Sequence, residues 1–354
     1  ILSEGGTFFE HRCTLARSRS VWGPYVPCPY NPILRQKDST KQIQKAGHGK
    51  LVEDSNGHWW MMHLGGRPLT EYGNCPLGRE TFLERVRWTE DDWFIVGDQG
   101  TPEDSVTVSY DNERSLLLGA GEAEDSIVDH FGASELPFHW EWVRYPVEHG
   151  FELTRQGLVI HCMPYLLQSP QSTLILTRRW KHLNFESTLR MKFNPQTAGE
   201  EAGALLYRDL DAHLLFTVRS GIGQTTGQPY DVSRLHENQE HQGLYLQIDL
   251  CEKGFRKKLF QKKLDLDPDE DIWLRIKLVN NAESVLFSYS LDGVVFIDTT
   301  AACSVSFLYP ENAARFFCFT APRIGFFARG VMGTIHGQAL FQEFYYIKGT
   351  RSES

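Results

Sequence analysis

The chain has 354 residues, of which 41% are hydrophobic and 23% charged, so it is long enough for about two globular domains. Its formal net charge of −9 argues against a nucleic-acid partner, and no run of apolar residues is long enough to predict a membrane-spanning helix. Its seven cysteines form no CxxC pair, which indicates neither a zinc site nor a disulfide framework.

Short strands separated by turns are predicted along most of the chain, and helical periodicity is almost absent. Near the N-terminus, LVED (51–54) and WWMMHL (59–64) flank Asn56-Gly57, a pair that favours a tight turn because both residues tolerate positive φ. Further along, TLRMKF (188–193) alternates apolar and polar residues, which is typical of a half-buried strand.

Two more hairpins are predicted in the second half of the chain. GALLYRDLDAHLLFTVR (203–219) turns near 209–212, and SVLFSYSLDGVVFID (284–298) turns at Asp292-Gly293. Between them lies a basic cluster that we interpret as the solvated face of a strand rather than a binding patch. Its members are Arg256, Lys257, Lys258, Lys262 and Lys263. The pattern as a whole predicts an all-β protein.

A change of composition predicts the domain boundary. The segment 111–137 is rich in Gly, Ala, Glu and Asp and lacks strand alternation, so we place a linker at 119–137. Residues 138–354 then have the length of one large β-sandwich. Residues 1–118 supply two or so blades of a propeller, at roughly 40–50 residues per blade.

Three N-terminal stretches carry a family resemblance. They are SEGGTFFEHRCTLARSRSVWGPYVPCPYNPIL (3–34), QKAGHGKLVEDSNGHWWMMHLGGRP (44–68) and CPLGRETFLERVRWTEDDWFIV (75–96). In this order and spacing they resemble glycoside hydrolase family 43, in its two-domain β-xylosidase/α-L-arabinofuranosidase type. The similarity continues through LPFHWEWVRYP (136–146) and FTAPRIGFFARG (319–330).

The resemblance implies a fold and an activity. The fold would be the C-terminal part of a five-bladed β-propeller followed by a concanavalin-like β-sandwich. The activity would be exo-acting, inverting hydrolysis of xylan- or arabinoxylan-derived oligosaccharides, with one carboxyl group as acid and another as base. The alternative is a non-catalytic carbohydrate-binding or interaction module.

The same resemblance implies that the chain contains no catalytic carboxylate. The family's base Asp, the Asp that tunes the acid, and the acid Glu are all expected upstream of Ile1. Glu4, Glu53 and Glu80 each match a segment with another role, so none of them is assigned to catalysis.

Two predicted substrate-binding residues lie in the first two stretches. Thr7 matches a strand position that faces the sugar, although a solvent-facing hydroxyl is the alternative. His48, in AGHG, matches a histidine at the pocket floor that could orient a carboxylate by hydrogen bonding. Its alternative is a purely structural histidine before a strand.

Two further predicted substrate-binding residues lie far apart in sequence. Arg79, in LGRE, matches an arginine that grips sugar hydroxyls with its fork of donors. Its alternative is an ion pair with Glu80 or Glu84. Phe319 matches an aromatic wall of the pocket, with core packing beside neighbouring phenylalanines as the alternative.

The expected partners are xylo- and arabino-oligosaccharides, with no nucleic acid and no membrane. No cofactor is required, and the resemblance leaves a calcium ion at the propeller centre open. Because an unclosed propeller exposes strand edges, a homo-oligomer or pairing with the missing N-terminal part is also expected. The odd cysteine count and the lack of Asn-x-Ser/Thr sites favour a cytoplasmic location.

Overall fold

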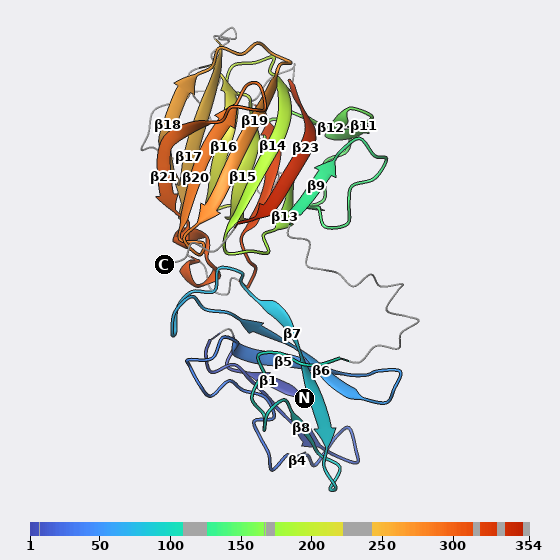
Figure 1. The fold of residues 1–354 in the computed structure, drawn as a ribbon. Helices are drawn as coiled ribbons and strands as arrows, with labels where there is room; N and C mark the ends of the chain where they lie inside the picture. Colours follow the sequence, from blue (N-terminus) through green and yellow to red (C-terminus); the bar gives the residue numbers. More distant parts are fainter. Residues whose placement is uncertain are drawn as a thin grey trace. The chain divides into compact units, whose positions relative to one another are not determined.

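A computed structural model gives the structure of residues 1–6, 8–108, 126–165, 167, 174–221, 243–313, 319–330 and 337–349. The regular secondary structure of these residues is almost entirely β-strand, which confirms the predicted all-β fold class (Figure 1). They divide into two compact units. The first is Ile1–Gly121 with Arg315–Ala321, and the second is Glu122–Ala314 with Pro322–Ser354. No helix among the described residues is long and apolar enough to span a membrane.

The first unit contains a four-stranded antiparallel sheet in the order β5-β6-β7-β8, the form of a propeller blade. Its strands are β5 (Gln44–Glu53), β6 (Trp59–Gly66), β7 (Glu80–Trp88) and β8 (Phe94–Val96). Two short ribbons accompany it: β1 (Leu2–Glu4) with β2 (Arg12–Thr14), and β3 (Ala16–Arg17) with β4 (Val26–Pro27). Closure into five blades stays a prediction.

The predicted hairpin at Asn56-Gly57 is confirmed, because β5 pairs with β6 from Glu53↔Trp59 onward. Asp54 organises its turn: Oδ1 accepts hydrogen bonds from the backbone N–H of Asn56 and His58, at 2.8 and 2.9 Å. Its Oδ2 accepts a hydrogen bond from the indole of Trp60 at 2.9 Å. The turn is therefore fixed by one carboxylate as well as by the backbone.

The second unit is a sandwich of two antiparallel sheets. The seven-stranded sheet runs β10 (Glu141–Trp142), β13 (Ile175–Arg179), β22 (Arg323–Arg329), β15 (Glu201–Asp209), β16 (Ala212–Ser220), β17 (Leu244–Glu252), β18 (Phe255–Lys263). The eight-stranded sheet runs β11 (Phe151–Thr154), β12 (Gly157–His161), β23 (Gln338–Lys348), β14 (Phe185–Asn194), β19 (Asp271–Val279), β20 (Ser284–Ser290), β21 (Ile297–Ser304). Short 3-10 turns, η2 (Ser306–Leu308) and η3 (Pro310–Asn312), follow β21.

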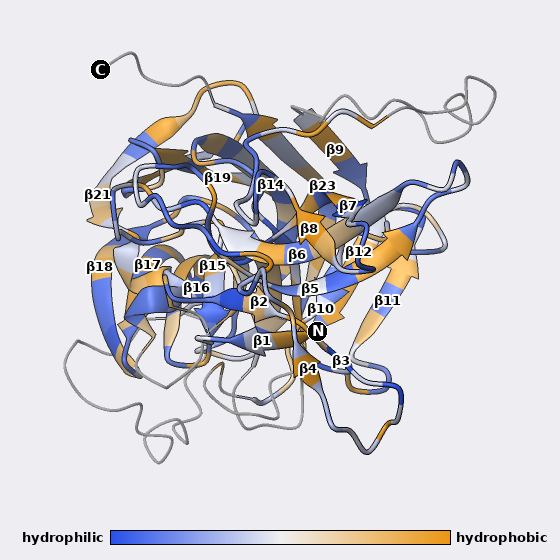
Figure 2. Ribbon diagram, turned by 90° about the horizontal axis from the view of Figure 1, so that it is seen from below, coloured by the Kyte–Doolittle hydropathy of each residue, from blue (hydrophilic) through white to orange (hydrophobic). Residues whose placement is uncertain are grey.

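Aromatic side chains join the two sheets of the sandwich. Phe216 of β16 packs edge-on against Phe287 of β20, with ring centres 5.3 Å apart. Phe326 of β22 stacks on Phe341 of β23 at 4.4 Å. Figure 2 shows hydrophobic and hydrophilic residues mixed along the strands, as expected where one face of a strand is buried.

The remaining predicted strands are found, and one segment differs from its prediction. The hairpins β15–β16 and β20–β21 and the strand over 188–193 are confirmed. Residues 126–130, assigned above to the linker 119–137, form β9 (Ser126–His130) and pair with β23. Burial alternates along β9, but the sequence hides this alternation because its buried residue, Asp129, is polar and the exposed Val128 is apolar.

The prediction that the basic cluster on β18 is a solvated strand face is only partly correct. Lys257, Lys262 and Lys263 are exposed, as predicted. Arg256 instead turns inward and contacts Glu201 at 3.1 Å and Asp249. The charge of Arg256 is therefore used inside the fold, because the buried carboxylate of Glu201 needs cationic partners.

His213 of β16 should make the stability of the sandwich pH-dependent. It is fully buried, its Nδ1 lies 3.2 Å from the carbonyl oxygen of Asp209, and burial lowers the pKa of His213 to about 4. Keeping His213 neutral in the folded state stabilises the sandwich relative to the unfolded chain only where the unfolded chain is also neutral. Because the folded pKa lies below the unfolded value of about 6.5, the free energy of unfolding has its full value above pH 6.5. It falls, by on the order of 3 kcal/mol, as the pH drops towards 4.

Chemical unfolding across this pH range would measure the effect. We expect His213→Leu to flatten the dependence between pH 6.5 and 4, because leucine does not titrate. His149→Ala, at a histidine whose side chain is 90% exposed, should leave the slope unchanged. An unchanged slope in His213→Leu would contradict the assignment.

Candidate functional site

Arg79 and Phe319, predicted to line one pocket, are in contact within the first unit. The guanidinium carbon of Arg79 lies 4.2 Å from the centre of the Phe319 ring, a cation–π arrangement. Nη2 of Arg79 also donates a hydrogen bond to the carbonyl of Gly6 at 3.4 Å. Burial lowers the pKa of Arg79 from its ordinary value, but a guanidinium stays charged in proteins. The pair therefore offers a fixed cation beside a half-exposed aromatic ring.

Gly78 holds the segment that carries Phe319 against the start of β7. Its φ is +64°, and a Cβ added there would lie 2.5 Å from the backbone nitrogen of Ala321. Only glycine accommodates both the left-handed backbone and this close approach. The glycine of the LGRE motif is thus explained by the close approach of Ala321, two residues after Phe319.

Gly78→Ala is expected to destabilise the first unit and to move Phe319 away from Arg79. A positive φ costs a non-glycine residue about 1–2 kcal/mol, and here the clash with Ala321 adds to it. Gly6→Ala is the matched control: its φ is +59°, but nothing lies within 4 Å of the added Cβ. Thermal unfolding should show a larger drop in melting temperature for Gly78→Ala than for Gly6→Ala. Equal drops would mean that the contact with Ala321 is unimportant.

His11, which is not among the predicted site residues, lies close to Arg79 and His48. It is 3% exposed, and its Nδ1 donates to the carbonyl of Lys45 at 2.9 Å. Burial lowers the pKa of His11, and the nearby charges of Arg79, His48 and His63 lower it further. The ring also fills the space that a Cβ on Gly47 would occupy, at 2.4 Å. His11 is therefore a neutral imidazole packed under the AGHG motif.

His48 lies at an irregularity in β5, where the pairing with β6 shifts between Gly47 and Lys50. Its φ is +57°, and its side chain is exposed. A histidine with positive φ is uncommon, and such outliers cluster at functional sites. The structure brings His48 near His11 and agrees with an accessible imidazole, while its place at a pocket floor stays a prediction.

A second buried histidine, His63 of β6, faces Glu84 of β7. Nε2 of His63 lies 3.7 Å from Oε1 of Glu84, and both side chains are fully buried. Glu84 also accepts a hydrogen bond from the backbone N–H of Glu103 at 3.0 Å. No sequence pattern signalled this pair, because the two residues meet only through the register of β6 with β7.

The carboxylates closest to the family motifs are committed to other contacts. Glu80 forms a two-point ion pair with Arg67, at 2.7 and 2.9 Å, rather than with Arg79. Glu4 accepts hydrogen bonds from Arg12 and Thr14, and these contacts lower the pKa of Glu4. A general acid needs a raised pKa, so Glu4 is poorly suited to that role.

A calcium ion at the propeller centre stays a prediction. Calcium takes six to eight oxygen ligands, whereas the groups gathered beside Arg79 are imidazoles. Among the described residues, no group of three or more His, Cys, Asp or Glu side chains could hold a metal ion. Among the described cysteines, Cys13, Cys28, Cys162 and Cys303 are free thiols.

Thr7 lies outside the described residues, so its predicted contact with the sugar stays a prediction. The same holds for Phe316 and Phe317, the neighbours proposed as the packing alternative for Phe319. The structure assembles a cluster of Arg79, Phe319 and Gly78 at the start of β7. His11 lies near enough to Arg79 for the arginine charge to lower its pKa.

Comparison with known families covers both units. Residues 1–94 match the model of glycosyl hydrolases family 43. Residues 128–347, more than half of the chain, match the β-xylosidase C-terminal concanavalin A-like domain. The chain belongs to glycoside hydrolase family 43. This confirms the resemblance and the concanavalin-like sandwich.

Curated relatives of this family 43 chain carry glycosidase names. A non-reducing end α-L-arabinofuranosidase, BoGH43B of Bacteroides ovatus, is 34% identical over 62% of this chain and 41% of its own length. A xylan 1,3-β-xylosidase of a Vibrio species is 27% identical over 98% of this chain and 62% of its own.

Solved family 43 structures share the fold. The BlXynB protein of Bacillus licheniformis superimposes with a TM-score of 0.78 at 29% identity, over 98% of this chain. A xylan β-1,4-xylosidase of Bacillus halodurans gives 0.77 at 27% identity. In both cases the match covers 62% of the longer protein. The chain therefore spans less than two thirds of the length of these relatives.

Proposed function

We propose that this chain forms the substrate-gripping part of an exo-acting family 43 glycosidase that releases xylose or arabinose from non-reducing ends with inversion. The contact of Arg79 with Phe319 carries the proposal. It supplies a fixed cationic fork and an aromatic wall at the two positions where the family resemblance expects them. The names of the relatives support xylan-type substrates.

In this proposal Arg79 and Phe319 divide the work of recognition. The guanidinium presents donors in a plane, which suits two adjacent sugar hydroxyls. The Phe319 ring, 40% exposed, gives the apolar face of the sugar a surface to pack on. Because Phe319 also holds Arg79 by the cation–π contact, the fork is oriented before the sugar arrives.

The proton-transfer groups are proposed to come from outside this chain. An inverting glycosidase needs an acid and a base roughly 6.5–9.5 Å apart, with room for a water molecule. Glu4 and Glu80 are engaged by arginines, Glu84 is buried beside His63, and Glu53 is exposed on β5. None of these four glutamates is proposed to act as the acid or the base.

Two assays on this chain alone test the proposal. We expect xylobiose to bind, measured by calorimetry, without release of p-nitrophenol from its β-xyloside or α-L-arabinofuranoside. Glu4→Gln, Glu53→Gln and Glu80→Gln serve as activity controls. Turnover that any one of these variants abolishes would show that the chain contains its own catalytic carboxylate. A lack of xylobiose binding would overturn the recognition role of Arg79 and Phe319.

A further inference from the structure

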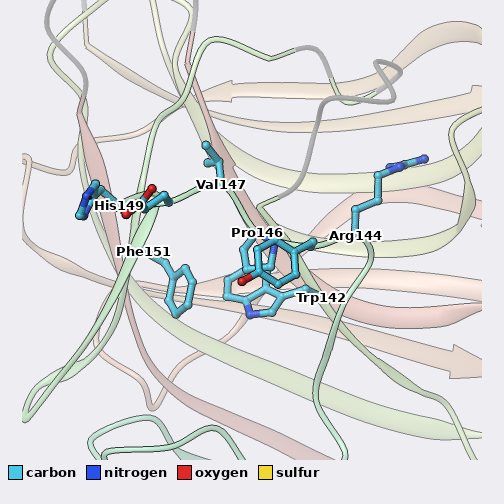
Figure 3. A pocket seen from close by; sticks show the side chains of 8 residues that line it. Trp142, Arg144, Pro146, Val147, His149 and Phe151 are labelled. Carbon is cyan, nitrogen blue, oxygen red and sulfur yellow. Dashed lines mark ion pairs between the residues drawn. The ribbon is translucent and has the colours of Figure 1, made fainter.

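An open hollow lies in the second unit, between the end of β10 and the start of β11. It has a volume of about 980 Å³ and is lined by Trp142, Arg144, Tyr145, Pro146, His149 and Phe151, among others. Figure 3 shows Phe151 facing the side where Trp142 and Pro146 lie, with Arg144 beyond them and its guanidinium directed away from Phe151. The hollow falls within the size range of roughly 300–1,000 Å³ in which small ligands bind.

Aromatic rings form one wall of this hollow, where Trp142 and Phe151 are half-buried and Tyr145 is accessible. Trp142 packs against Phe151 with ring centres 4.7 Å apart and planes tilted by 46°. Tyr145 is 93% exposed. A large aromatic side chain left in water gives up the free energy of its burial, so an exposed tyrosine beside an apolar wall is a candidate binding contact.

The hollow is held in shape by the fold around it. The backbone N–H of Val143 donates to Ile175 at 3.0 Å, and that of Gly150 donates to Val147 at 3.1 Å. Arg144 donates a side-chain hydrogen bond to the buried Tyr207, whose pKa is raised to about 12 by burial. The phenol therefore stays protonated, and the guanidinium is anchored at the edge of the hollow.

Polar groups complete the rim. His149 and Glu148 lie side by side, with Nε2 3.5 Å from Oε1, and both are about 90% exposed. With Arg144 they place donors and an acceptor around an apolar wall, and their charges largely offset one another. This combination suits a neutral ligand that has flat apolar faces and hydroxyl edges, rather than an anion or a purely apolar surface.

We propose that this hollow is a second carbohydrate-binding site, which takes a segment of a xylo-oligosaccharide. A xylopyranose ring carries no exocyclic hydroxymethyl group, so both of its faces can lie flat on Trp142 or Tyr145. Its hydroxyls would meet Arg144, Glu148 and His149 at the rim. The choice of a xylose-based ligand rests on the proposed function, whereas the site itself shares no residue with the Arg79 cluster.

Calorimetry with xylohexaose, carried out on the full chain with Arg79→Ala, tests this site by itself. We expect binding to persist and to weaken by about fivefold on adding Tyr145→Ala, the scale of one aromatic contact. Tyr145 is so exposed that its removal should not affect folding. Phe138→Ala is the matched control, because Phe138 is 96% exposed and does not line the hollow.

The outcomes separate this proposal from the proposed function. If xylohexaose binding in Arg79→Ala is absent, or ignores Tyr145→Ala, the hollow is not a sugar site. If Tyr145→Ala instead alters self-association, measured by sedimentation, the hollow is a protein contact and the proposal is wrong. Xylobiose titrated into Tyr145→Ala with Arg79 intact reports on the Arg79 site alone, so its loss would count against the proposed function only.

Discussion

Arg79→Ala is expected to weaken xylobiose binding by about 10- to 100-fold, the range for a hydrogen bond to a charged group. The guanidinium lies 4.2 Å from the ring of Phe319 and is half-buried, so its loss removes a preorganised donor rather than a mobile one. Arg79→Lys should recover little, because an ammonium cannot present two donors in one plane. Calorimetric titration of the full chain measures both variants.

Arg85→Ala is the matched control for this experiment. Arg85 lies on β7, six positions after Arg79, but its side chain is exposed to solvent. We expect unchanged affinity and unchanged thermal stability. Equal losses of affinity in the two variants would show that the net charge, and not the geometry of Arg79 with Phe319, attracts the sugar.

Glu201→Ala should lower the free energy of unfolding of the sandwich by about 3–5 kcal/mol, the cost of breaking a buried ion pair. The Glu201 side chain is fully buried and contacts Arg329 at 2.6 Å, Arg256 at 3.1 Å and Arg219 at 3.2 Å. Its removal leaves buried positive charge with less compensation. Glu186→Ala, at a partly exposed carboxylate paired with Arg275 and Lys277, should cost about 0–1 kcal/mol.

The same cluster predicts loss of stability in acid. Burial raises the pKa of Glu201, but the charges of Arg256, Arg329 and Arg219 outweigh that and hold the pKa well below its usual range. Because the folded pKa lies below the unfolded one, this stabilisation is complete above about pH 4.5 and is lost as the pH falls further. Urea unfolding of Glu201→Ala below pH 4.5 should therefore show a weaker pH dependence than the parent chain, and an equal dependence would contradict this assignment.

Much of the fold could be predicted from local pattern. Alternation in 188–193 and the turn at Asn56-Gly57 report which residues face inward and where the chain reverses, and both are local properties. The strand β9 could not be found this way. It forms because 126–130 pair with the distant β23, and its hydropathy pattern does not predict a strand because the buried residue is Asp129 and the exposed one is Val128.

The candidate site likewise contains residues that sequence motifs predict and residues that only the structure reveals. Family motifs identified Arg79 and Phe319, and the structure shows them in contact. They did not identify His11 or the His63–Glu84 pair, which depend on the approach of Gly47 to one ring and on the register of β6 with β7. Such contacts require the backbone to be in place before the side chains can meet.

By itself the sequence determined the all-β class, the hairpins and the family, and it predicted Arg79 and Phe319 as residues that grip a sugar. These follow from short-range alternation, turn chemistry and motif order, all of which are written along the chain. The tertiary structure decided that Gly78 seats Phe319 beside Arg79, that Arg256 serves a buried carboxylate, and that Trp142 and Phe151 share a hollow. Each of these joins residues from different strands or loops, and only the folded register brings such residues within contact distance.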